Sequence, residues 1–198
     1  RTPITTHLVN ALSKPAYVDR AWQRIREEVA EGHQAYVVAP RISAGTPEDA
    51  DMDFLFGTES KEMAAVTELA PELATGPLKG LRVAELHGKQ SAEEKEATMQ
   101  AFSAHELDVL VSTTVIEVGV DVPNATVMVI MDADRFGISQ LHQLRGRIGR
   151  GEAPGLCLLI TKVPEDSLAY ERLTAVANTL DGFELARIDL DQRREGDV

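Results

Sequence analysis

The chain has 198 residues, is 43% hydrophobic and 26% charged, and carries 32 acidic against 20 basic side chains for a formal charge of −12. This length suits one domain, no apolar run approaches the ~20 residues of a membrane span, and no leader indicates export. The single cysteine excludes an internal disulfide and a Cys-rich zinc site, so we expect a cytoplasmic protein with no membrane partner. The chain begins at Arg1 rather than Met, and we expect it to be a piece of a longer protein.

Six runs of apolar and β-branched residues have the length of strands. Each run is nearly continuous rather than alternating, which is typical of strands buried on both faces of a parallel sheet. The runs are Ile4–Val9, Ala35–Ala39, Leu81–Leu86, Asp108–Val111, Thr126–Met131 and Gly155–Thr161.

Helical spacing of apolar residues appears between these runs. Val18–Val29 has Pro15 before it and Gly32 after it, and a capping box of Ser91 and Glu94 precedes a helix that ends near Phe102. A last helix, Ala169–Leu180, follows Pro164, and we expect Glu165 and Asp166 in its first turn. Strands that alternate with helices predict an α/β fold with a mostly parallel sheet.

One stretch is strongly acidic. Between Glu48 and Glu72 there are eight acidic residues and one base, Lys61. We expect an exposed insertion loop in its first part and a helix over Met63–Leu73 in its second. A solvated acidic face is favoured over a docking site for a partner.

The segment Gln143–Arg150 carries the strongest chemical signal. From Ser139 to Arg150 there are three arginines and no acid. Arg147 and Arg150 are three residues apart, so on a helical turn they can point the same way and hold a polyphosphate between planar donor forks. Such a pair, supplied across a domain boundary, can act as arginine fingers in phosphoryl transfer. On spacing alone, a surface helix end with salt bridges remains an alternative.

Two further segments follow predicted strands. Ser112, Thr113 and Thr114 resemble a helix cap at the carboxyl end of a parallel strand, where phosphate groups bind; a simple cap is the alternative. Gly88 and Lys89 offer a backbone amide and an ammonium group suited to one backbone phosphate. They do not form a P-loop, because no glycine stands five residues before Gly88 and Gln90 follows Lys89.

Other residues predict little chemistry. The chain has no Asp-Glu dipeptide to hold magnesium, and its five histidines lack the i, i+4 spacing of a metal site, so we expect no metal ligands. Cys157 lies in an apolar run and is expected to fill the core.

These motifs resemble a known family. Gln143-x-x-Gly146-Arg147-x-Gly149-Arg150 matches the last motif of superfamily 2 helicases, and Thr113-Thr114 through Gly119-x-Asp121 resembles the motif before it. Ala35–Arg41 stands at the position of the first motif of the second lobe. More narrowly, three segments resemble RecG, an ATP-dependent DNA helicase family that remodels stalled replication forks; they are residues 1–6, 112–125 and 140–151.

The resemblance implies the second RecA-like lobe of such a motor, of the P-loop NTPase type but itself without a P-loop. ATP with Mg²⁺ would be bound mainly by a first, N-terminal lobe outside this chain. In this lobe Arg147 and Arg150 would be the fingers that reach ATP, and three other residues would help: Gln143 positions the fingers, while Gly119 and Asp121 line the nucleotide cleft. The residues expected to contact the DNA backbone are Thr113, Thr114, Arg41, Gly88 and Lys89.

The resemblance also implies a division of the chain. Residues 1–162 would form the lobe, and residues 163–198 a truncated helical segment that couples lobe movement to translocation. The family tends to read Arg-Gly-Pro-Gly where this chain has Arg193-Arg194-Glu195-Gly196, so no role is carried over to the two arginines.

The implied partners are branched DNA and the N-terminal lobe and wedge domain of the same full-length protein, in a bacterial cytoplasm. The full-length protein would be an ATP hydrolase acting on stalled forks and Holliday junctions in recombination and repair, and this chain alone would be inactive. Two alternatives are the motor lobe of a transcription-repair coupling factor-like translocase and a non-catalytic binding module for nucleic acid or protein.

Overall fold

The structure of the chain, a computed structural model, describes residues 4–40, 66–113 and 122–179. Its centre is a six-stranded sheet with the order β1-β6-β5-β2-β4-β3, in which every neighbouring pair is parallel. The described strands are β1 (Ile4–Asn10), β2 (Gln34–Val38), β3 (Val83–Leu86), β4 (Val109–Ser112), β5 (Ala125–Ile130) and β6 (Gly155–Thr161). The predicted parallel sheet is confirmed, and the six apolar runs coincide with the strands to within two residues at each end.

Helices connect the strands, and their boundaries follow local signals in most cases. The helices are α1 (Pro15–Ala30), α3 (Val66–Thr75), α4 (Ala92–Ser103), α5 (Ile138–Arg145) and α6 (Leu168–Asn178), with a short 3₁₀ helix η4 (Ala133–Arg135). The Ser91 hydroxyl accepts a hydrogen bond from the backbone N–H of Glu94 at 3.1 Å, so the predicted cap of α4 is confirmed. Residues 63–65 of the predicted acidic helix, and the whole predicted insertion loop, lie outside the described residues.

The start of α6 corrects one expectation. Its N-cap is Ser167, whose hydroxyl accepts from the backbone N–H of Tyr170 at 3.2 Å. Glu165 and Asp166 therefore precede the helix instead of occupying its first turn. A serine that can accept from the N3 amide is a strong cap, and it sets the boundary after the two acids.

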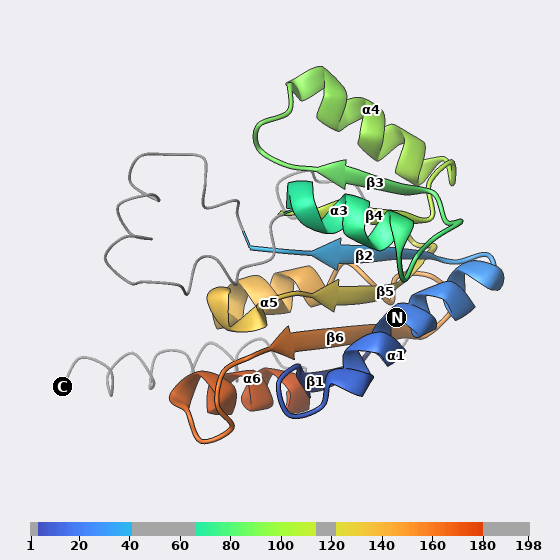
Figure 1. Cartoon of the computed structure of the whole chain (residues 1–198). Coiled ribbons are helices and arrows are strands. Elements are labelled where there is room, and N and C mark those ends of the chain that lie inside the picture. Colours follow the sequence, from blue (N-terminus) through green and yellow to red (C-terminus); the bar gives the residue numbers. More distant parts are fainter. Residues whose placement is uncertain (1–3, 41–65, 114–121, 180–198) are drawn as a thin grey trace.

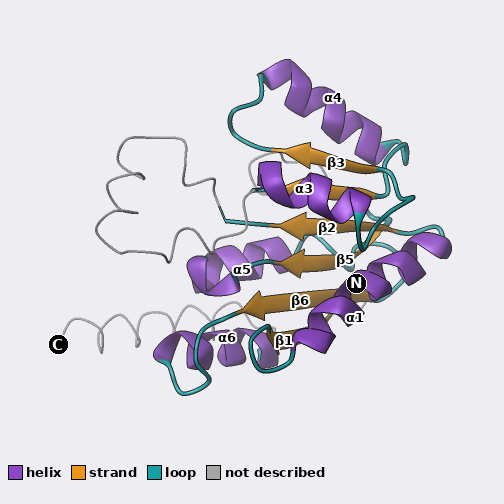
Figure 2. Cartoon of the chain, in the orientation of Figure 1, coloured by secondary structure: helices purple, strands orange, loops and turns teal. Residues whose placement is uncertain are grey.

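Two hydrophobic clusters hold the helices on the two faces of the sheet (Figure 1). The residues of α1 and α3 pack on one face, and those of α4, α5 and α6 pack on the other. Figure 2 shows the helices and strands of the chain by type. Within the second cluster the rings of Tyr36 and Phe102 lie 5.1 Å apart. Cys157 is fully buried in the same cluster, so its predicted place in the core is confirmed.

Helix α6 follows the predicted domain boundary at residue 162. Its side chains Leu173 and Val176 are buried in the same cluster as strands β5 and β6, while the segment that follows residue 179 is outside the described part. The division at residue 162 stays a prediction. Within the described ranges, no helix is both long enough and apolar enough to cross a membrane.

Candidate functional site

The predicted arginine fingers lie in a turn that follows α5. The helix ends at Arg145, and Gly146 is its C-cap. Tighter hydrogen bonds then replace the α-helical ones, with Arg147 N donating to Leu144 O at 2.9 Å and Ile148 N to Arg145 O at 3.3 Å. Gly149 has φ +73°, a conformation that favours glycine. We call Gly146–Gly151 the arginine turn; Arg147 and Arg150 are carried by this turn and not by a regular helix.

The arginine turn presents its two arginines differently. Arg147 is partly buried and Arg150 is exposed, while Ile148 between them is fully buried and anchors the turn in the core. The Nε–H of Arg150 donates to the carbonyl of Gly146 at 2.8 Å, which ties this side chain to the start of the turn. Gln143 is exposed on the last turn of α5, four residues before Arg147. The three residues that carry the predicted ATP contacts therefore lie within residues 143–150, at the end of α5 and in the arginine turn.

The third arginine of this segment is internal. Arg145 is 2% exposed, and its guanidinium donates to Val176 O at 2.6 Å, Thr179 O at 2.7 Å and more weakly to Thr6 Oγ1 at 3.4 Å. Burial lowers the pKa of this guanidinium, although Arg stays charged. The sequence suggested that three arginines contribute positive charge to this surface, but only Arg147 and Arg150 reach it. The signal available in the sequence was the position of Arg145, four residues after Leu141 on the apolar stripe of α5.

The arginine turn lies at the amino ends of two strands. An ideal Cβ built on Gly151 would come 2.5 Å from the carbonyl oxygen of Pro123, two residues before β5. An ideal Cβ on Gly155, the first residue of β6, would come 3.0 Å from the backbone nitrogen of Gly149. The backbone of the turn is therefore packed against the starts of β5 and β6.

The predicted DNA contacts lie at the opposite, carboxyl edge of the sheet. Thr113 directly follows β4, and its backbone N–H donates to Leu86 O, the last residue of the neighbouring β3, at 3.2 Å. Gly88 and Lys89 are exposed in the loop after β3. Because both strands end at this edge, the structure brings Thr113, Gly88 and Lys89 to the same end of the sheet.

The loop after β3 is held by side chains. The Gln90 amide accepts from His87 N at 3.1 Å and donates to Glu85 O at 3.2 Å. The backbone N–H of Lys89 donates to His87 Nδ1 at 3.2 Å, so this amide already has a partner within the loop. The ammonium group of Lys89 is the cationic group that the loop presents.

The remaining predicted site residues, Arg41, Thr114, Gly119 and Asp121, lie outside the described residues. The described chain stops at Thr113, at the carboxyl end of β4, and resumes at Val122, close to the start of β5.

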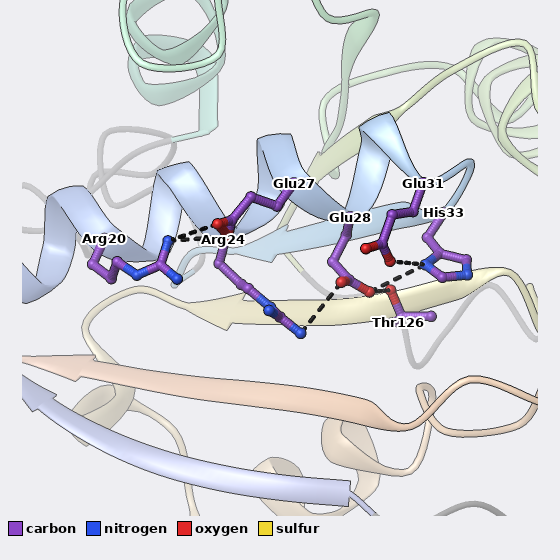
Figure 3. Close-up of polar contacts among 7 residues, drawn as sticks. All are labelled: Arg20, Arg24, Glu27, Glu28, Glu31, His33 and Thr126. Atoms are coloured by element: carbon purple, nitrogen blue, oxygen red, sulfur yellow. Dashed lines mark hydrogen bonds and ion pairs between the residues drawn. The ribbon is translucent and has the colours of Figure 1, made fainter.

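A second polar cluster occupies the amino edge beside α1 (Figure 3). The buried carboxylate of Glu28 accepts from Thr126 Oγ1 at 2.7 Å and lies 3.2 Å from His33 Nδ1 and 3.3 Å from Arg24 Nη2. Glu28, Glu31 and His33 place ligand atoms within 4.8 Å of one another, a grouping that sequence spacing did not predict. The Arg24 guanidinium opposes a cation at this carboxylate, so we assign the cluster the role of fixing α1 to β5.

The comparisons with known proteins identify the family of the chain. Residues 20–152 match the family described as the helicase conserved C-terminal domain. The chain belongs to the helicase conserved C-terminal domain family.

Within this helicase family the chain is similar to RecG proteins. It is 59% identical over 198 residues to the ATP-dependent DNA helicase RecG of Mycobacterium tuberculosis, covering 100% of this chain and 26% of that protein. A solved structure of RecG bound to a three-way DNA junction superimposes with a TM-score of 0.72 at 37% identity, covering 96% of this chain and 22% of that one. The resemblance to RecG inferred from the motifs is confirmed, and the chain spans about a quarter of the length of the curated relatives it matches.

The helicase fold extends to more distant proteins. The yeast DEAD-box splicing factor Prp28 gives a TM-score of 0.52 at 17% identity, covering 90% of this chain and 33% of that one. At this identity the match concerns the fold alone. The predicted RecA-like helicase lobe is confirmed as the fold class.

Proposed function

We propose that this chain is the second motor lobe of an ATP-dependent DNA helicase or translocase that remodels branched DNA. The observation that carries the proposal is the 59% identity to a RecG helicase over all 198 residues of a chain that carries the arginine turn. The RecG structure bound to a three-way junction supports branched DNA as the substrate class. The first lobe and the wedge domain are proposed partners within the same full-length protein.

The arginine turn suits the polyphosphate of ATP. Two guanidiniums within four residues, one partly buried and one exposed, provide planar donor forks that match phosphate oxygens. In phosphoryl transfer the charge spreads over the equatorial oxygens of the transferred group, and cationic donors aimed at that charge lower the barrier. Arg147 and Arg150 take this role, and Gln143, on the last turn of α5, positions them.

ATP and Mg²⁺ are bound mainly by the first lobe in this proposal. A metal ion held there would supply positive charge that neutralises part of the phosphate charge. This chain adds the arginine turn from across the cleft, together with Gly119 and Asp121 as lining residues. The nucleotide therefore makes all of its proposed protein contacts only when the two lobes close on it.

DNA is held at the other edge of the sheet. Lys89 supplies a cation, and Gly88 and Thr113 supply close backbone approach and a hydroxyl, which are groups suited to phosphates and not to base edges. Thr114 and Arg41 are proposed to extend this contact. Residues 114–121 join Thr113 to Val122 in the chain, and we propose that this segment couples ATP turnover to movement along DNA.

The experiment is Arg150→Ala in the complete protein, with DNA-stimulated ATP hydrolysis as the measurement. Loss of an arginine finger costs on the order of 10³–10⁵ in related phosphoryl-transfer enzymes, so turnover should nearly vanish. Arg20→Ala is the matched control, because Arg20 is a half-exposed arginine of α1 paired only at the surface with Glu27. Wild-type turnover by Arg150→Ala would contradict the assignment.

A further inference from the structure

We propose that Gly151 is a positioning residue for ATP hydrolysis, because it lets the arginine turn lie directly against the backbone of Pro123. This inference rests on the proposed function, since it concerns where Arg147 and Arg150 are held. Gly151 itself contacts neither nucleotide nor DNA in the proposal; it acts through the adjacent Arg150.

The contact leaves no room for a side chain. An ideal Cβ on Gly151 lies 2.5 Å from Pro123 O, 3.3 Å from Pro123 C and 3.7 Å from Pro123 Cβ. Real Cβ atoms essentially never lie within 3.0 Å of another heavy atom, so any substitution must displace either the turn or Pro123. Glycine here serves close approach of two backbone segments.

Pro123 belongs to a corner that cannot easily yield. Its neighbour Asn124 donates through Nδ2 to Gly32 O at 2.9 Å and to Gln34 Oε1 at 3.0 Å, while Asn124 O accepts from Gln34 N at 3.0 Å. The Gln34 side chain in turn donates to Phe102 O and Leu107 O at 2.7 and 2.8 Å. This network fixes the corner to the buried start of β2, so the arginine turn is the part that must move.

The opposite side of the turn is also closed. Gly149 lies against Gly155 at the start of β6, where an added Cβ would come 3.0 Å from Gly149 N and 3.2 Å from Gly149 Cα. Ile148 is fully buried, and the same added Cβ on Gly155 would come 3.3 Å from its Cδ1. The backbone of the turn is therefore packed against the amino ends of both β5 and β6. The hydrogen bond from Arg150 Nε–H to Gly146 O ties the side chain of the proposed finger to this backbone.

The expected effect of Gly151→Ala is on the chemical step. Relief of the contact requires a shift of roughly 1 Å, and a misplacement of that size can cost about 10²-fold in rate. Because the first lobe holds most of the nucleotide, the KM for ATP should change by less than about threefold while kcat falls by about 10- to 100-fold. A purely structural role would instead lower the melting temperature and leave the kcat of the folded fraction unchanged.

The experiment measures kcat and KM for ATP, the melting temperature and fork binding in the complete protein carrying Gly151→Ala. Gly137→Ala is the matched control, since its Cβ would meet nothing nearer than Gln140 Oε1 at 3.7 Å. Gly155→Ala is the second test, because its milder 3.0 Å contact should lower kcat by about 3- to 10-fold. We expect kcat to fall most in Gly151→Ala, less in Gly155→Ala and not in Gly137→Ala, with fork binding close to wild type and a loss of melting temperature too small to account for the fall in kcat.

The outcomes separate this inference from the proposed function. Wild-type kcat in Gly151→Ala, alongside an inactive Arg150→Ala protein, would overturn the positioning role and leave the fingers in place. Active Arg150→Ala protein would overturn the proposed function. If Gly151→Ala does not fold, Gly155→Ala decides: an unchanged kcat there, or a fall in kcat matched by lost stability, would overturn the inference.

Discussion

The guanidinium of Arg145 joins the last turn of α5 to the last turn of α6, donating to Val176 O at 2.6 Å. It also donates to Thr179 O at 2.7 Å, so one buried side chain satisfies two carbonyls at the end of α6. Arg145 immediately precedes the arginine turn, and this contact fixes where the turn begins relative to α6.

Arg145→Leu should therefore destabilise the protein. The substitution removes the donor to Thr179 O and leaves Val176 O with the weaker bond from Thr179 N at 3.4 Å; a buried unsatisfied acceptor costs about 1–3 kcal/mol. We expect a loss of about 2–4 kcal/mol in the free energy of unfolding, measured by chemical denaturation. Arg145→Lys should recover only part of it, because an ammonium cannot reproduce the planar fork. Unchanged stability in Arg145→Leu would contradict this account of the contact.

The sequence predicted the central strands well because β2, β4 and β5 are buried on both faces of the sheet. A continuous run such as Ala125–Ile130, every residue of which is buried, differs plainly from a helical pattern. The cap of α4 could also be predicted from the sequence, because Ser91 and Glu94 are close together along the chain. These features depend on residues that are close together along the chain.

The relationships that were missed depend on distant residues. Composition treats Arg145 as surface charge, and only the packing of α6 on α5 shows that it is internal. Likewise, no local pattern reveals that Gly151 lies against Pro123, or that the arginine turn and Thr113 lie at opposite ends of the sheet. Helix α5 follows the carboxyl end of β5, and the chain then returns to the amino end of β6. The arginine turn, which follows α5, therefore lies at the opposite end of the sheet from Thr113.

Cys157 should make stability fall at alkaline pH. Burial raises the pKa of its thiol from 9.0 to about 12. Above pH 9 the unfolded chain releases this proton while the folded chain keeps it, so stability decreases as pH rises from 9 toward 12, by up to about 1.4 kcal/mol per pH unit. Other groups also titrate there, so the measurement is the difference between wild type and Cys157→Ala. An alkaline decline equal in both proteins would contradict the prediction.

Asp108 should contribute stability that is lost in acid. Burial raises the pKa of this carboxyl, but hydrogen bonds from Arg82 outweigh that effect and lower it overall. Arg82 donates from its backbone N at 2.8 Å and from Nη2 at 2.9 Å. The contribution is present above the unfolded pKa of about 4 and disappears as pH falls through the lower folded value. Asp108→Asn should thus be less stable than wild type at pH 7, with the difference shrinking toward pH 2; a pH-independent difference would count against the ion pair.

Lys89→Ala in the complete protein should weaken DNA binding without sequence preference. Removing one phosphate contact should lower the slope of log K against log salt by about 0.7–0.9. Lys79→Ala is the control, because Lys79 is exposed but lies before β3, at the amino edge of the sheet. Equal effects of the two substitutions on DNA binding would contradict the proposed contact between Lys89 and DNA.

We propose that this chain supplies half of a nucleotide site. The test is DNA-stimulated ATP hydrolysis by the complete protein, compared with the 198-residue chain alone at equal concentration on branched DNA. We expect turnover by the complete protein and none above background by the chain alone. ATP hydrolysis by the isolated chain would contradict this proposal.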